Sequence, residues 1–125
     1  MNYRLPDKDL TANPSGSIPT ITFNSNLSST HFHVQVQTPN GWQMVVDSAG
    51  LGNPVPIKGG PIGSAADFPG KTFFWDITLA SDSDTDPIEA VLEVVIGQDG
   101  NTLLVVDDDH SITGQESYYE YLNSK

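Results

Sequence analysis

The strand patterns between Lys71 and Asp109 constrain the fold of this chain more than any other feature. Apolar residues recur at every second position in KTFFWDITL and again in IEAVLEVVIG, which is the period of a strand with one buried face. The predicted inward residues are Phe73, Trp75, Ile77 and Leu79 in the first strand, and Ile88, Ala90, Leu92, Val94 and Ile96 in the second. Asp99-Gly100 then favours a tight hairpin turn into TLLVVDDD. This stretch therefore predicts three strands of a β-rich core.

Further strands are predicted on both sides of this stretch. HFHVQVQT turns at Pro39-Asn40-Gly41 into WQMVVD, so residues 31–47 are a predicted hairpin with Phe32, Val34 and Val36 inward. Ile21 and Phe23 share one face of SIPTITF. The last segment, around SYYEY, fits a strand better than the short helix that Ser117 and Glu120 would also permit. We expect an all-β fold, a two-layer antiparallel β-sandwich of immunoglobulin-like or jelly-roll type with about seven to eight strands.

Two segments lack a strand pattern. Residues 1–17 are polar and contain prolines, and they are predicted to form an N-terminal arm that docks onto its own sheet or onto a neighbour's. Residues 48–70 hold six glycines and four prolines, which predicts a covering or assembly loop with room for a short edge strand at Val55–Ile57. A chain of 125 residues suits one domain, so we expect a single sandwich domain over residues 18–125.

The charge is concentrated in one half of the chain. Residues 1–75 hold four acidic and four basic residues, whereas residues 76–125 hold twelve acidic residues and one basic residue. Such a surface repels nucleic acids and anionic membranes and attracts cations, including Ca²⁺. The absence of cysteine excludes disulfides and thiolate metal sites. The first ten residues show no apolar core of an export signal, and no run approaches the ~20 apolar residues of a membrane span. We expect a soluble protein and assign no compartment.

The acidic loop after the first strand of the core is the candidate metal site. Asp82, Asp84 and Asp86 alternate, a spacing that lets carboxylates converge on one Ca²⁺ ion. Glu93 stands at the twelfth position, as in an EF-hand, but Pro87 replaces the required glycine and the flanks are strands. We therefore predict a Ca²⁺ site in a strand-connecting loop, with a solvated acidic turn as the alternative. Further ligands could come from the end of the third strand, at Asp107, Asp108 and Asp109.

A second, weaker metal pattern lies on the hairpin. His31 and His33 share the outward face of their strand and could bind Zn²⁺ if a third ligand, for which His110 is a candidate, lay nearby. Without that ligand, the pair is an exposed strand face. Asp76 is a single carboxylate among apolar neighbours, which is not by itself a mechanism.

Aromatic residues provide the candidate ligand-binding surface. Their rings could stack on a sugar, although core or edge packing explains aromatic residues in strands equally well; they are Trp42, Tyr118, Tyr119 and Tyr121. The sequence contains no nucleophile motif such as G-x-S-x-G, so we do not expect an enzyme. We expect a binding module, with Ca²⁺-dependent recognition of a glycan or another surface molecule. The alternative is a self-assembling structural subunit, a homo-oligomer that uses the arm and the loop at 48–70.

Overall fold

The computed structural model describes residues 2–48, 57–62, 70–81 and 85–125. These residues form strands and no helix. The strands are β1 (Asn2–Arg4), β2 (Lys8–Leu10), β3 (Thr20–Ser25), β4 (Ser28–Thr38), β5 (Gly41–Ser48), β6 (Ile57–Pro61), β7 (Thr72–Ala80), β8 (Ile88–Gln98), β9 (Asn101–Ile112) and β10 (Gln115–Ser124). The expected all-β class is confirmed, and the last segment is a strand. Within the described ranges, no helix is long and apolar enough to cross a membrane.

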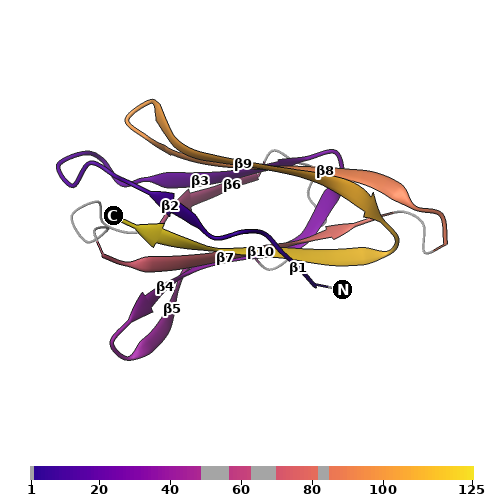
Figure 1. Cartoon of the computed structure of the whole chain (residues 1–125), viewed down its shortest axis with the longest axis horizontal. Helices are drawn as coiled ribbons and strands as arrows, with labels where there is room; N and C mark the ends of the chain where they lie inside the picture. The colour runs from indigo at the N-terminus through magenta and orange to yellow at the C-terminus, as the bar shows by residue number, and fades with distance from the viewer. Residues whose placement is uncertain (1, 49–56, 63–69, 82–84) are drawn as a thin grey trace.

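The strands form two sheets that face each other in a sandwich-like arrangement (Figure 1). Sheet A has the order β1-β10-β7-β4-β5, with β2 also paired to β10, and sheet B has the order β6-β3-β8-β9. Neighbours are antiparallel except β1 and β2, which both run parallel to β10. The described strands number ten rather than seven or eight, because the N-terminal arm contributes two and residues 57–61 contribute another. The immunoglobulin-like or jelly-roll topology remains a prediction.

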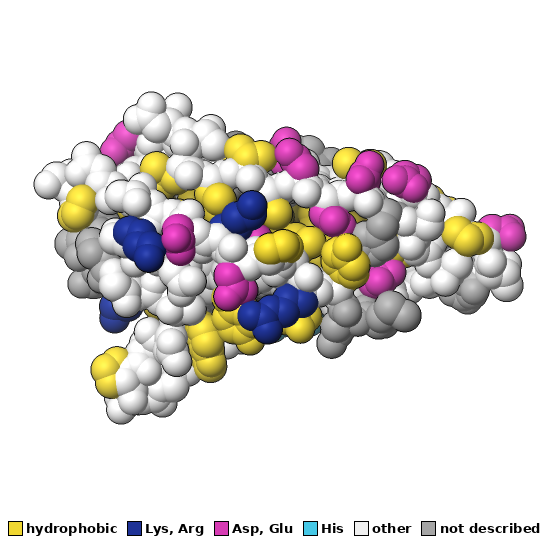
Figure 2. Space-filling model, viewed as in Figure 1, with side chains coloured by type: hydrophobic (Ala, Val, Ile, Leu, Met, Phe, Trp, Pro, Cys, Tyr) yellow, Lys and Arg dark blue, Asp and Glu magenta, His cyan; other side chains and the backbone are white. Residues whose placement is uncertain are grey.

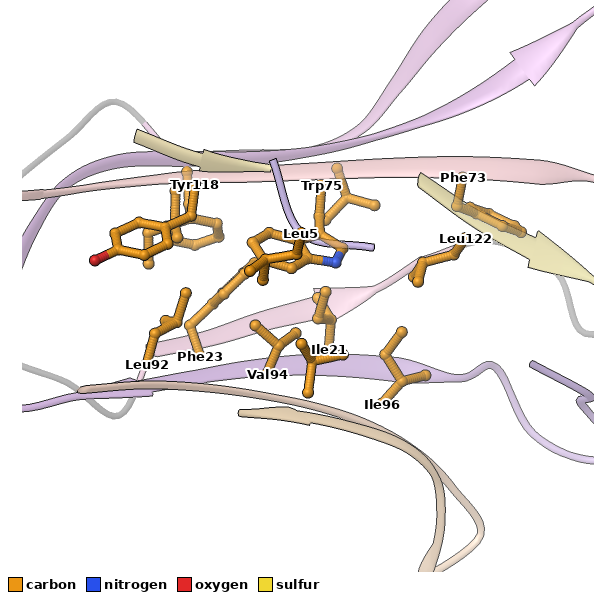
Figure 3. Packing of buried hydrophobic residues seen from close by; sticks show 14 of the residues in the cluster. Leu5, Ile21, Phe23, Phe73, Trp75, Leu92, Val94, Ile96, Tyr118 and Leu122 are labelled. Atoms are coloured by element: carbon orange, nitrogen blue, oxygen red, sulfur yellow. The ribbon is translucent and has the colours of Figure 1, made fainter. Parts of the chain in front are cut away.

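The core lies between the sheets and follows the predicted alternation. Inward side chains from both sheets pack together around Trp75 in the close view of the core (Figure 3). The four apolar residues predicted to point inward from β7 are all buried, as are Ala90, Leu92, Val94 and Ile96 of β8. Asp99 and Gly100 have φ angles of 52° and 78°, which is the conformation that the predicted hairpin turn requires.

The N-terminal arm docks onto its own sheet. Its two short strands lie along β10, and the amide of Leu5 donates a hydrogen bond of 2.9 Å to the carbonyl of Tyr119. Leu5, Leu10 and Ala12 are buried, so the arm does carry core residues, contrary to its polar appearance in the sequence. After these residues the arm turns at Asn13. The backbone amide of Asn13 donates a hydrogen bond of 2.9 Å to the side-chain oxygen of Gln98, which is buried.

At the opposite edge of sheet A, the β4–β5 hairpin projects from the body of the molecule (Figure 1). Trp42, next to its turn, remains 44% exposed, and Met44 is also exposed. Most of the Gly/Pro-rich segment 48–70 lies outside the described residues. Its described part contains β6, which begins at Ile57, one end of the range in which an edge strand was expected.

Candidate functional site on the outer face of sheet A

The outer face of sheet A gathers polar and aromatic side chains from β4, β7 and β10. The strand register places Phe74, Asp76 and Thr78 of β7 at the centre of this face. Their neighbours on β10 are Tyr121, Tyr119 and Ser117, and on β4 they are Gln35, His33 and His31. Residues of these three strands line an open depression of about 320 Å³, which we call the sheet A depression: His31, Phe74, Asp76, Thr78, Ser117, Tyr119 and Tyr121.

Aromatic rings form one half of the depression. The centroid of the Phe74 ring lies 5.1 Å from that of Tyr121 and 5.9 Å from that of Tyr119. Trp42 extends the group from β5, with its ring 6.2 Å from Phe74 and 6.1 Å from Tyr121. The guanidinium of Arg4 lies 4.9 Å from the centroid of the Tyr121 ring, so the arm borders this aromatic cluster. Separations of this size are those of interacting aromatic pairs.

His31, Asp76, Thr78 and Ser117 line the other half, and His33 lies beside the first two. Nδ1 of His33 lies 2.6 Å from Oδ1 of Asp76 and 2.8 Å from Nε2 of His31. The same Nε2 of His31 lies 3.6 Å from Oδ1 of Asp76. Three atoms that can each offer a lone pair therefore converge at one place on the sheet surface.

The local sequence explains this convergence. The two-residue period of β4 puts His31 and His33 on the same face, and the pairing of His33 with Asp76 brings the carboxylate beside them. A register shift between Ser29 and His31 places His31 opposite Thr78. Asp76 is thus not an isolated carboxylate, because it lies beside both histidines, whereas the third ligand that the sequence suggested was His110. His110 lies in β9, which belongs to sheet B.

The predicted aromatic residues are divided between the two faces. Trp42, Tyr119 and Tyr121 meet on the outer face of sheet A, together with Phe74, which the sequence analysis did not select. Tyr118 points into the core and is fully buried, with its ring 5.8 Å from that of Tyr3. Burial holds the pKa of the Tyr118 phenol well above its ordinary value. Tyr118 therefore does not line the depression.

Those predicted Ca²⁺ ligands that the structure describes do not line the sheet A depression. Asp82 and Asp84 are outside the described residues, and Asp86 is exposed. Glu93 of β8 pairs with Asp107 of β9 and accepts a hydrogen bond of 2.9 Å from the side-chain amide of Asn24.

The run of aspartates on β9 adds to that acidic surface. Asp107, Asp108 and Asp109 line a separate open depression with Val91. Figure 2 shows acidic side chains along the β8–β9 side of the molecule. The Ca²⁺ site itself stays a prediction.

Glu116 and Glu120 of β10 are both buried, and the burial of Glu120 is complete. Glu120 points into the core from β10, and its Oε1 accepts a hydrogen bond of 3.0 Å from the indole Nε1 of Trp75. Burial raises the pKa of the Glu120 carboxyl to about 7, although the hydrogen bond from Trp75 and the positive charge of Lys8 act in the opposite direction. Glu120 faces away from the sheet A depression, so we assign it a structural role.

Comparisons with known proteins assign no family. No family model and no curated protein matches the sequence. Among solved structures, the chain is similar to the crystal structure of a domain of unknown function, DUF4425, from Bacteroides vulgatus ATCC 8482. The TM-score is 0.39 with 9% sequence identity, over 85% of this chain and 94% of that one.

Proposed function

We propose that the protein is a non-catalytic binding module that holds a carbohydrate in the sheet A depression. The observation that carries this proposal is the aromatic cluster of Phe74, Tyr119, Tyr121 and Trp42 on an open, half-exposed sheet face. Most aromatic residues in a small sandwich pack into its core, as Trp75 and Tyr118 do here. A second aromatic group on the outer face, beside polar side chains, has the composition of a ligand site.

The chemistry of the depression matches that of a sugar. A sugar ring offers a C–H face that packs against an aromatic ring, and hydroxyl groups at its edge that need hydrogen-bond partners. Asp76, Thr78 and Ser117 lie beside the rings and supply acceptors and donors; the hydroxyls of Thr78 and Ser117 are 2.8 Å apart. The net charge of −11 disfavours anionic glycans, so we infer a neutral carbohydrate.

The test is a titration with a panel of neutral oligosaccharides. Binding is measured by calorimetry or from the tyrosine and tryptophan signals in NMR spectra. Tyr121→Ala removes the ring that contacts both Phe74 and Trp42, and we expect it to weaken binding at least about tenfold, or ~1.4 kcal/mol. Tyr3→Ala is the matched control, because Tyr3 is an exposed tyrosine that packs against Tyr118 instead. Equal affinity of the two variants for a bound sugar, or no binding to wild type across the panel, would contradict the proposal.

Self-assembly is the second candidate function, and the projecting β4–β5 hairpin favours it. β5 is an edge strand of sheet A and carries exposed Trp42 and Met44, a combination that invites pairing with another chain. The N-terminal arm is used within the molecule, so this edge and the segment 48–70 would supply the contacts. Sedimentation of wild type and Trp42→Ser at rising concentration tests this candidate, which requires a wild-type oligomer that the variant loses.

A further inference from the structure

We propose that His31, His33 and Asp76 bind one first-row divalent transition metal ion, with Zn²⁺ as the probe. The three residues form a group within metal-binding distance, and the atoms that face one another are Nε2 of His31, Nδ1 of His33 and Oδ1 of Asp76. This site is distinct from the predicted Ca²⁺ site in the acidic loop, and it does not depend on carbohydrate binding, because the metal ion alone is the ligand.

The spacing of the three atoms fits such an ion. Ligands at 2.0–2.1 Å from a tetrahedral Zn²⁺ are about 3.3 Å apart by geometry. The three pairs here are separated by 2.6, 2.8 and 3.6 Å. These separations differ from the tetrahedral value by about 0.7 Å or less, which is under the length of a bond, so small side-chain adjustments should suffice. No strand has to move, since the three residues already occupy neighbouring positions of paired strands.

The chemistry of the trio also favours a cation at its centre. Two imidazole nitrogens lie at hydrogen-bond distance when one ring donates a hydrogen bond to the other or when both bind the same metal ion. A proton on Nδ1 of His33 can form a good hydrogen bond with either Nε2 of His31 or Oδ1 of Asp76, but not with both at once. A divalent cation, in contrast, accepts an electron pair from each of the three atoms. A metal-free ion pair between a protonated histidine and Asp76 is the competing state, and it predicts no metal binding at neutral pH.

Burial and backbone support hold the ligands in place. His33 and Asp76 are only 19% and 23% exposed, whereas His31 is 44% exposed and leaves an open side for entry of the ion. Asp76 lies on β7, which is paired on both sides within sheet A, so the carboxylate is anchored by two neighbouring strands. Three protein ligands leave a fourth position for water, on the side of the sheet A depression, whose lining includes Tyr119, the neighbour of Asp76 on β10.

The ligand set also predicts which ions bind. Two imidazoles and one carboxylate suit Zn²⁺, Co²⁺, Ni²⁺ or Cu²⁺, whereas Ca²⁺ and Mg²⁺ prefer oxygen ligands. The ion should bind more weakly at acidic pH, because each imidazole must lose its proton to coordinate it. This order of preference separates the trio from the acidic surface on the β8–β9 side.

The experiment titrates the full chain, freed of metal, with Co²⁺ at pH 7.5 and follows the visible absorption that tetrahedral coordination gives to this ion. Zn²⁺ is then added to displace it. We expect one Co²⁺ per chain, displaced by one equivalent of Zn²⁺ and not by a large excess of Mg²⁺ or Ca²⁺. His31→Ala, His33→Ala and Asp76→Asn should each lower the affinity by about 100-fold or more, since loss of even a supporting partner costs 10–100-fold.

His110→Ala is the matched control, because it removes a histidine from sheet B and should leave the absorption unchanged. Circular dichroism checks that each variant remains folded. His31 is the most exposed of the three ligands, so its replacement should be tolerated even if Asp76→Asn is not. The proposal is overturned if wild type gives no absorption with Co²⁺, or if the absorption survives in folded His31→Ala or disappears in His110→Ala.

Discussion

Both faces of β7 and β10 carry aromatic and carboxylic side chains, but these are buried on the inner face and partly exposed on the outer face. On the inner face, Trp75 and Tyr118 are fully buried and join the core that sheet B closes. On the outer face, one position along each strand, Phe74 and Tyr119 remain partly exposed and border the sheet A depression. The same two strands therefore supply both the stability of the fold and the candidate site, and neighbouring residues separate the two tasks.

The carboxyl groups on these faces show the difference most clearly. Glu120 on the inner face meets the indole of Trp75, and its pKa rises because burial disfavours the charged form. Asp76 on the outer face lies beside two imidazoles instead. Glu120 thus packs in the core, whereas Asp76 belongs to the proposed metal site, because their strand positions point to opposite sides of the sheet.

The largest expected effect concerns the inner face. Trp75→Ala should lower the free energy of unfolding by ~3–5 kcal/mol, because it empties a large site in a close-packed core. Trp42→Ala should cost much less, since that side chain is 44% exposed on the outer face. Urea unfolding of both variants measures the difference. Similar losses in the two variants would mean that the outer aromatic cluster is a second core rather than a binding surface.

The second effect concerns Glu120 and pH. The carboxyl has an ordinary pKa of 4.5 and a pKa of about 7 in the folded protein, so between these values the folded state holds a proton that the unfolded state has lost. Stability from this group is therefore present below pH 4.5 and falls as pH rises toward 7, by on the order of 3 kcal/mol in total. Glu120→Gln keeps an acceptor for Trp75 and should not show this loss.

The measurement is the difference in unfolding free energy between wild type and Glu120→Gln across pH 4.5 to 7.5, which removes the contribution of all other carboxylates. Lys8 and Asp7 act on Glu120 in opposite directions and are present in both proteins. A difference that does not change with pH would show that Glu120 is ionised in the folded state.

The third effect concerns the N-terminal arm, which contributes Leu5 to the inner face of sheet A and Arg4 to the outer face. Leu5→Ala should cost about 2–3 kcal/mol, because Leu5 is buried between the sheets. Arg4→Ala removes a side chain that lies over Tyr121 on the outer face, and we expect little change in stability. Thermal unfolding of the two adjacent variants tests this contrast. Equal stability of both would mean that the arm is detached in solution.

The smallest effect concerns the predicted Ca²⁺ site in the acidic loop. If the acidic loop binds Ca²⁺ at millimolar concentration, as weak surface sites do, millimolar Ca²⁺ should stabilise the fold by about 1 kcal/mol. The gain should exceed that with Mg²⁺ at constant ionic strength, disappear in Asp84→Asn/Asp86→Asn, and persist in His31→Ala. Loss of the gain in His31→Ala would instead place both cations at the sheet A trio.

The sequence was sufficient for the elements in which alternation is strong. β7, β8 and the Asp99-Gly100 turn follow from local pattern, since burial of one face dictates apolar residues at every second position. The same two-residue period, applied to SYYEY, would have placed Tyr118 on one face of the strand and Tyr119 and Tyr121 on the other. It would also have placed Glu120 inward with Tyr118; the negative charge of glutamate concealed this, because burial of a carboxyl group is unusual.

Long-range pairing was the part that the sequence could not supply. The contact of His33 with Asp76 depends on β4 and β7 being neighbours, and a hairpin and the segment 48–70 separate these strands in the chain. The arm was missed for a related reason: Leu5 and Leu10 stand alone among charged residues and prolines, so no periodic signal marks them. For the histidine–aspartate contact, the sequence offered one signal: Asp76 is a charged residue in the middle of a largely apolar strand.

The docking of the arm has a consequence for the order of folding. Asn2 pairs with Ser117 and Lys8 with Leu122, so the arm finds its partners only after the chain between them, more than 100 residues long, has been made. Closing so long a loop costs entropy, which the rest of the sandwich must offset before the arm can add. We therefore expect the arm to join after the folding transition state, so that replacing Leu5 accelerates unfolding and leaves the folding rate nearly unchanged. Until it joins, the edge of β10 is open to any other extended chain.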